Sequence, residues 1–526
     1  MADDGASLLE VLREQLGVRS AKDGCSPQGQ CGCCTVWVDG APRVACVTPV
    51  RRLAGREVTT LDGLPADTRR RWADALVATG GSQCGFCTPG IVMRLAALPP
   101  SAPVEKVDQA LVAHLCRCTG WQTIREAAAR AVVPATPLGP MRDRDQLDRA
   151  SARARLEGGA PQHVGPDVVL GDAGFADDTH PPEAMVAVPD GDGGYAVAES
   201  LAAARTLAGK VQGRSTGLPL GHPVAVPDGE WALTLQTTWV EPAYIEPDSS
   251  WCRPGQEPAS PYGNGGAFGG KLHSPVAVDA RRLADEYGRP VRVLWSREDV
   301  VRRGPKRPPV GGGIDATGTG ILRVGVPIDG VDAEQWSALA EVVASVAPGL
   351  RLEPVPVLGP PIAYSLRGAV WAEAAVLSAG VGALGAYGPG GHRDVPLVVV
   401  APDGGRAVAR CRPDNSIEVT VGAGEVLDPV VLRSYCIGAV HQALGWVRSE
   451  GVAVDASGVV QDLTMRSFGV LQARAMPAVD VHFDPASDGP AVNGSDAVFA
   501  AVAAARWVAD GLVGSWPVDR SGAGRR

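Results

Sequence analysis

The chain has 526 residues, of which 45% are hydrophobic and 20% charged, and its formal net charge is −9. A nucleic-acid surface needs clustered Lys and Arg, so this acidic balance argues against a nucleic-acid partner. No apolar run reaches the roughly 20 residues of a membrane span, and the N-terminus reads as an acidic amphipathic helix, so we expect no membrane span and a cytoplasmic location.

Cysteine is concentrated in the first quarter of the chain. Nine of the 12 Cys lie between Cys25 and Cys118. In a reducing compartment such clustering favours metal binding over disulfides. The scattered Cys252, Cys411 and Cys436 are expected to be buried apolar residues.

The first cysteine group lies in AKDGCSPQGQCGCCTVWVDG, and a strand-like stretch follows it. Its order is C-x5-C-x2-C with a distant fourth Cys, close to the C-x4-C-x2-C order of plant-type ferredoxins. The predicted ligands of one [2Fe–2S] cluster are Cys25, Cys31, Cys34 and Cys46, with Cys33 as a spare. A zinc knot or free structural cysteines are the alternatives, although zinc sites usually show two separated C-x2-C pairs.

The second group places a C-x2-C pair and a C-x-C pair at the starts of two predicted helices. Thr88-Pro89-Gly90 puts a Pro in the first turn of a helix, and helix N-termini offset the negative charge of a cluster. The predicted ligands of a second [2Fe–2S] cluster are Cys84, Cys87, Cys116 and Cys118.

These segments resemble a known family. GCSPQGQCGCCTVWVDG, SQCGFCTPGIVM and LCRCTGW are similar to the iron–sulfur region of the xanthine dehydrogenase and aldehyde oxidase family of molybdenum hydroxylases, over about residues 6–130. The first loop is one residue longer than the usual spacing. The strand that normally opens the ferredoxin-like fold is missing, which leaves open whether the N-terminus is complete.

Three later islands resemble the molybdopterin-binding subunit of the same family, and the resemblance implies a cofactor loop in GNGGAFGGKLHSPVAVDARRLADEYG. A glycine-rich loop before a helix lets backbone donors approach an anion, although a tight turn is the alternative. The predicted molybdopterin-binding residues are Gly265, Gly266, Phe268, Gly269 and Gly270. GGGIDATGTGIL reads as a hairpin turn instead.

The resemblance also implies a catalytic base near the C-terminus. At the position where the family has a glutamate, this chain has Asp496 in the segment GPAVNGSDAVFAAVAAA. Ser495 is the less favoured candidate for the same position. An Asp is one methylene shorter, and an error near 1 Å can cost about 10²-fold in rate. The alternative makes Asp496 the N-cap of the following helix. The basic residues Arg302, Arg303, Lys306 and Arg307 read as a solvated turn.

The expected fold class is α+β, with a ferredoxin-like β-grasp [2Fe–2S] domain, a helical [2Fe–2S] domain and a reduced α+β molybdopterin-binding region. We expect the ferredoxin-like domain at 1–60 and the helical [2Fe–2S] domain at 61–135. A linker at 136–165 and a hammerhead-like remnant at 166–230 would follow, and the molybdopterin-binding-like region would cover 231–526.

The resemblance implies an oxidoreductase that hydroxylates an aldehyde or N-heterocycle at molybdenum and passes electrons through two clusters. Its implied partners are a small-molecule substrate and a separate FAD-binding subunit or other electron acceptor. The alternative is a catalytically degenerate electron-transfer or scaffold subunit that docks an intact molybdenum subunit.

Overall fold

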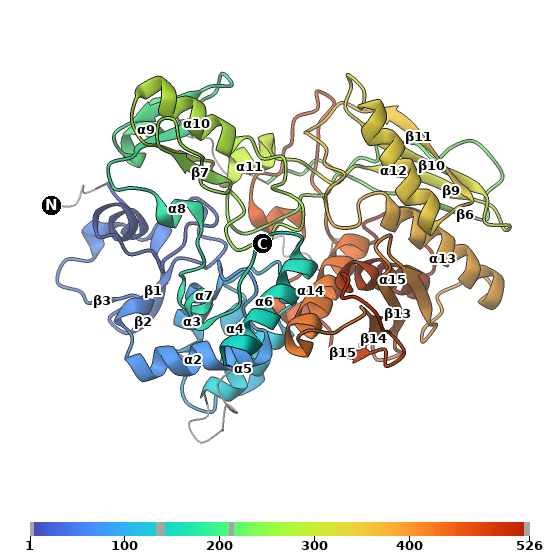
Figure 1. Ribbon diagram of the computed structural model, residues 1–526, viewed down its shortest axis with the longest axis horizontal. Helices are drawn as coiled ribbons and strands as arrows, with labels where there is room; N and C mark the ends of the chain where they lie inside the picture. The colour runs from blue at the N-terminus through green and yellow to red at the C-terminus, as the bar shows by residue number, and fades with distance from the viewer. Residues whose placement is uncertain (1–4, 133–142, 210–214, 520–526) are drawn as a thin grey trace.

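The computed structural model describes residues 5–132, 143–209 and 215–519 (Figure 1). Helices and four separate β-sheets alternate along the chain, so the protein is α+β as expected. Among these residues no helix combines the length and apolar character needed to cross a bilayer.

The N-terminal part is a short helix followed by a small antiparallel sheet. Helix α1 (Leu8–Glu10) continues into a π-helical turn at Val11–Gln15. The sheet has the order β2-β1-β3, with β1 at Thr35–Val38, β2 at Ala41–Val44 and β3 at Val58–Thr59. Three 3₁₀ turns join these elements, at Ala45–Val47, Val50–Arg52 and Leu61–Gly63.

Four helices follow this sheet. They are α2 (Ala66–Thr79), α3 (Thr88–Leu95), α4 (Val104–Leu111) and α5 (Gln122–Val132). Helix α3 carries Pro89 in its first turn, as its sequence predicts. Both predicted helix starts beside the second cysteine group are therefore present.

The segment that we interpret from the sequence as a linker with a charged helix does contain a helix. Residues 133–142 lie outside the described residues, but α6 (Arg144–Gly158) begins with a capping box made by Asp143 and Gln146. Its Arg153–Glu157 pair is fully buried, so α6 is packed into the protein. The short helices α7 (Pro166–Leu170) and α8 (Ala176–Thr179) follow.

One sheet combines strands from both sides of residue 230. Its order is β5-β4-β8-β7, with β4 at Met185–Pro189, β5 at Tyr195–Ala198, β7 at Ser249–Cys252 and β8 at Val291–Leu294. The associated helices are α9 (Leu201–Ala208), α10 (Val276–Tyr287) and α11 (Arg297–Arg303).

The remaining two sheets form the other side of the molecule (Figure 1). The order β11-β10-β9-β6 uses β6 (Leu233–Gln236), β9 (Val310–Ile314), β10 (Gly320–Val326) and β11 (Leu350–Pro356). Strands β9 and β10 pair antiparallel, so the predicted hairpin is confirmed. The order β12-β13-β14-β15 uses β12 (Leu397–Val400), β13 (Arg406–Cys411), β14 (Ile417–Gly422) and β15 (Val479–Phe483).

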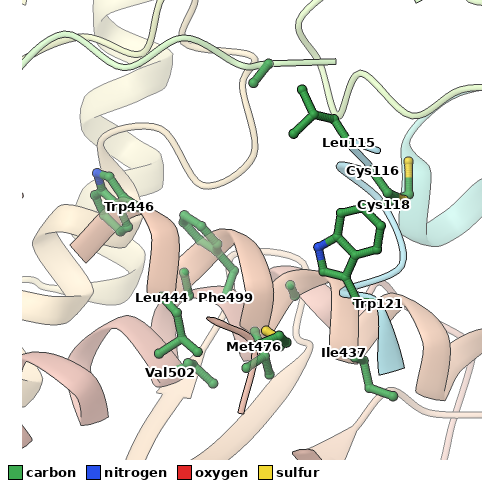
Figure 2. Packing of buried hydrophobic residues seen from close by; sticks show 14 of the residues in the cluster. Leu115, Cys116, Cys118, Trp121, Ile437, Leu444, Trp446, Met476, Phe499 and Val502 are labelled. Carbon is green, nitrogen blue, oxygen red and sulfur yellow. The ribbon is translucent and has the colours of Figure 1, made fainter. Parts of the chain in front are cut away.

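Four long helices of this half contribute many residues to the main hydrophobic core. They are α12 (Ala333–Val346), α13 (Trp371–Tyr387), α14 (Pro429–Arg448) and α15 (Ser495–Ala509), with 3₁₀ turns at Met465–Phe468 and Ala473–Ala475. Figure 2 shows Trp121 beside Ile437 of α14, with Phe499 of α15 nearby. The cysteine-bearing segment before α5 therefore packs directly on the C-terminal half.

Candidate functional site

The four predicted ligands of the first cysteine group lie together around a buried loop. The β1–β2 hairpin returns the chain to this loop, so that the Cys46 amide donates to Sγ of Cys34 across 3.4 Å. The amides of Gln28 and Gln30 donate to Sγ of Cys25 across 3.3 and 3.5 Å. Backbone donors aimed at sulfur are one of the ways in which proteins tune iron–sulfur clusters.

The thiols of this group also contact one another. The thiols of Cys31 and Cys46 donate to Sγ of Cys25, and these bonds lower the pKa of Cys25 well below its usual value. A second bond joins Cys46 to Cys34. These contacts link the sulfurs in the order Cys31, Cys25, Cys46 and Cys34. One division of this chain of contacts between two irons is Cys25 with Cys31 and Cys34 with Cys46.

The second group shows the same paired arrangement more clearly. Sγ of Cys118 lies 3.6 Å from Sγ of Cys84. The Cys87 thiol donates to Cys116, which lowers the pKa of Cys116 to about 6. All four residues are buried, and Cys87 is the N-cap of α3.

The pairing bears on the choice between iron–sulfur and zinc. A structural zinc ion needs four ligands about 2.3 Å from a single point. Within the described ranges, no three His, Cys, Asp or Glu side chains converge in a way that would hold a single metal ion. Two pairs of thiolates instead suit a cluster in which two irons share the four cysteines.

The two groups lie next to each other through the spare cysteine. Burial raises the pKa of Cys33, and the neighbouring thiols of Cys25 and Cys84, one from each group, raise it further. Gly90 of α3 packs so closely here that a Cβ on it would lie 2.3 Å from the carbonyl oxygen of Gly32. Only glycine allows this approach, so the first loop and the helix that starts at the second group are in direct backbone contact.

The predicted cofactor loop lies against the second cysteine group. At Gly266, which has φ +90°, an added Cβ would lie 2.7 Å from Cβ of Cys84 and 3.3 Å from Sγ of Cys118. The neighbouring glycines face other protein atoms: Gly265 faces Gln162, and Gly269 faces the carbonyl oxygen of Ser365. Gly270 completes the loop against the ring of Tyr244.

An arginine joins this loop to the predicted catalytic residue. The guanidinium carbon of Arg367 lies 4.0 Å from the ring centre of Phe268, and its Nε donates to Oδ1 of Asp496 across 2.8 Å. Burial raises the pKa of Asp496, while Arg367 opposes the rise. Arg367 was not among the site residues predicted from the sequence. The Arg-Gly pair at Arg367 and Gly368, just before α13, is the sequence signal that could have indicated it.

The N-cap interpretation of Asp496 is wrong. The N-cap of α15 is Gly494, and Asp496 is the second residue of the helix. Oδ1 of Asn493 accepts from the Asp496 amide across 3.0 Å. The Asp496 carboxylate is therefore available to Arg367.

The space around Phe268 and Arg367 is small. The cavity there measures about 40 Å³, whereas small-molecule sites usually measure about 300–1,000 Å³. Two further ion pairs border it, Arg117 with Glu450 and Arg307 with Glu373. Because protein atoms also fill the faces of the glycine loop, a molybdopterin does not fit these residues as they are arranged.

The predicted solvated turn is also a buried feature in part. Lys306 and Arg307 are 0% and 6% exposed. Nζ of Lys306 lies 2.9 Å from Glu241, and Arg307 pairs with Glu373 across 2.8 Å. The prediction was wrong for these two residues because their carboxylate partners lie far away in the sequence.

Comparison with known proteins places the first part of the chain in a family. Residues 60–129 match the sequence profile of a [2Fe-2S] binding domain. The chain is 40% identical over 126 residues to the xanthine dehydrogenase iron-sulfur-binding subunit of Escherichia coli O157:H7, covering 23% of this chain and 78% of that subunit. It is 36% identical over 129 residues to the nicotinate dehydrogenase small FeS subunit of Eubacterium barkeri, covering 24% and 82%.

The chain belongs to the xanthine dehydrogenase and aldehyde oxidase family of molybdenum hydroxylases. It is also 40% identical over 140 residues to aldehyde oxidase 1 of Oryctolagus cuniculus, but this match spans only 10% of that protein. The chain spans only about a tenth of the length of such full-length relatives, and what it shares with them in sequence is the iron–sulfur region of an oxidoreductase family.

The rest of the chain shares the family fold. The aldehyde oxidoreductase of Desulfovibrio gigas aligns with a TM-score of 0.69 over 99% of this chain and 98% of that chain, at 15% sequence identity. This likeness shows that the two chains share a mixed α+β fold over nearly their whole lengths.

Proposed function

We propose that the chain holds two [2Fe–2S] clusters and conducts electrons between them. Cys25, Cys31, Cys34 and Cys46 would hold the first cluster, and Cys84, Cys87, Cys116 and Cys118 the second. The observation that carries this proposal is the pairing of thiols within two buried groups whose loops touch at Gly32 and Gly90.

The arrangement suggests an order for the two clusters. The second group lies against the glycine loop through Gly266, the loop that the family resemblance assigns to the cofactor. The first group lies in the N-terminal loop beside β1. Electrons would pass from the second cluster to the first and then to a separate acceptor, such as an FAD-binding subunit.

Elemental analysis and electron paramagnetic resonance test this proposal. Full-length protein purified without oxygen should contain about four iron and about four acid-labile sulfide per chain. Partial reduction should give two distinguishable paramagnetic signals. Two iron per chain, or zinc in place of iron, would contradict the two-cluster assignment.

Hydroxylation of an aldehyde or N-heterocycle at molybdenum is the second candidate. It is favoured by the convergence of Phe268 and Asp496 on Arg367, since two residues predicted for one site meet there. The small cavity and the filled glycine loop count against it. If the chain does not catalyse this hydroxylation, the alternative is that it is an electron-transfer subunit that docks an intact molybdenum subunit.

Molybdenum content separates these two candidates. Protein expressed with abundant molybdate should bind about one molybdenum per chain if it is a hydroxylase. Four iron without molybdenum would support the electron-transfer subunit, and it would leave the cluster assignment intact.

A further inference from the structure

A larger cavity lies away from the Phe268 and Asp496 region. It measures about 390 Å³ and shares no lining residue with the smaller cavity. This volume falls within the usual range for small-molecule sites. Ser26 and Pro27, which follow Cys25, line it together with Phe86, which lies between Cys84 and Cys87. A ligand in this cavity would lie beside both cysteine loops.

The charge of the wall selects the sign of a ligand. Ten carboxylate side chains line the cavity, against three arginines. Two of these arginines are engaged by carboxylates, since Arg13 pairs with Asp177 and Asp178, and Arg205 pairs with Asp23. Lys22, Lys271 and Arg292 do not line the cavity, but they pair with the lining residues Asp178, Glu246 and Glu14. Ten carboxylates therefore stand against six cations, and the remaining excess of negative charge attracts cations and repels anions.

Three oxygens of the wall lack hydrogen-bond donors. Glu246, Asp248 and Ser249 line the cavity and are 6%, 1% and 3% exposed. Oε1 of Glu246, Oδ1 of Asp248 and Oγ of Ser249 are buried without a hydrogen-bond partner among the described residues. Leaving a buried polar group unpaired is unfavourable, and more so when the group is charged.

The second carboxylate oxygen of Glu246 and that of Asp248 both have hydrogen-bond partners. Oε2 of Glu246 accepts from Nζ of Lys271 across 2.7 Å. Oδ2 of Asp248 accepts from the hydroxyl of Tyr244 across 2.6 Å. These contacts fix both side chains, so the segment that begins β7 keeps three acceptors for a molecule that brings donors.

The rest of the wall favours an organic ligand over a metal ion. Phe86 and Phe175 pack edge to face with ring centres 5.0 Å apart, and Leu201, Leu294 and Trp295 add apolar surface. An aromatic face also attracts a cation. A bare metal ion would need at least three converging ligands, and the described part of the chain offers no such group.

We propose that this cavity binds a small organic cation, an ammonium or amidinium group on an apolar body, whose N–H groups donate to Glu246, Asp248 and Ser249. The apolar body would pack against Phe86, Phe175 and the neighbouring aliphatic side chains. The site is independent of molybdenum and does not depend on the proposed electron path.

Calorimetric titration of the full-length, cluster-loaded protein tests the proposal. The probe is benzamidine, an aromatic amidinium, and benzamide is its neutral counterpart of nearly the same shape. Benzamidine should bind one per chain and at least about tenfold more tightly than benzamide, because charge-assisted hydrogen bonds are the stronger ones. Equal affinities, or no binding of benzamidine, would overturn the proposal and leave water as the partner of the three oxygens.

Two variants locate the site. Asp248→Asn removes the charge of the unpaired carboxylate and should weaken benzamidine binding about tenfold. Glu298→Gln is the matched control, because Glu298 lines the same cavity but its Oε1 already accepts from Gln28 across 3.0 Å. An equal loss in both variants would mean diffuse attraction rather than a site. If Asp248→Asn does not fold, the comparison of the two probes on the unchanged protein still decides the proposal.

Discussion

Nε of Arg367 donates to Oδ1 of Asp496 across 2.8 Å. This hydrogen bond connects the loop before α13 to the first turn of α15. The same guanidinium donates to Oγ of Ser495 across 2.9 Å. The two residues that sequence analysis proposed for one catalytic position are thus both bound by one arginine. Arg367 therefore has a structural role between the loop before α13 and the first turn of α15.

Removing this arginine should destabilise the protein. Arg367→Met leaves Asp496, whose side chain is 27% exposed, without its cation. We expect a loss of about 2 kcal/mol in the free energy of unfolding, the size of a hydrogen bond to a charged group. Adding Asp496→Asn should recover part of that loss, because the uncompensated charge is gone. Arg289→Met is the matched control: Arg289 pairs with Glu199 at the surface, so its loss should cost less than about 1 kcal/mol. Denaturation followed by circular dichroism measures all three, and equal losses for Arg367 and Arg289 would contradict the structural role.

The ligand assignment predicts selective loss of one cluster. Cys116→Ser should remove one of the two paramagnetic signals of the reduced protein and spare the other. Cys33→Ser is the control, since Cys33 is buried between the two groups but is not an assigned ligand. Both signals should survive that change. Loss of a signal in Cys33→Ser would show that the first ligand set is wrong.

The contact between the glycine loop and the second cysteine group predicts another selective effect. In Gly266→Ala, the new Cβ would lie 2.7 Å from Cβ of Cys84 at φ +90°, so the cysteine loop or the glycine loop must shift. We expect an altered signal from the second cluster and an unchanged signal from the first. Gly255→Ala is the matched control, because Gly255 also has a positive φ, +68°, with nothing within 4 Å of the new Cβ. An unaltered second signal in Gly266→Ala would argue against this contact.

Glu246 predicts a pH dependence of stability. Burial raises the pKa of Glu246 from 4.5 to about 7, although Lys271 opposes the rise. The folded chain then binds more protons than the unfolded chain between these values. Its stability contribution is therefore present at low pH and is lost as the pH rises through about 7.

The measurement compares the melting temperatures of the protein at pH 6 and pH 8. Between these two pH values, we expect ionisation of Glu246 to lower the free energy of unfolding of the unchanged protein by about 1 kcal/mol. Glu246→Gln removes the titrating group, so its stability should fall less over the same interval. Parallel pH profiles for the two proteins would show that Glu246 does not titrate there.

The local features of the iron–sulfur region could be predicted from the sequence. Cysteine spacing, a Pro at the start of α3 and the strand-like stretch after the first cysteine group depend on neighbours within a few residues. The structure has the expected helix start, and it folds the strand-like stretch into the β1–β2 hairpin. Thiols within each predicted ligand set contact one another. The roles of the individual cysteines remain predictions until the clusters are measured.

The cysteine groups, the α+β class and the family can be predicted from the chain alone, because short-range spacing and backbone preferences carry that information. The folded structure is needed to see that Lys306 and Arg307 are buried, that Arg367 contacts Asp496, and that the glycine loop faces protein atoms. It also created the cavity beside Asp248 from segments distant in the chain. Long-range charge pairs and cavities depend on which surfaces pack together, and packing brings together residues that no local pattern relates.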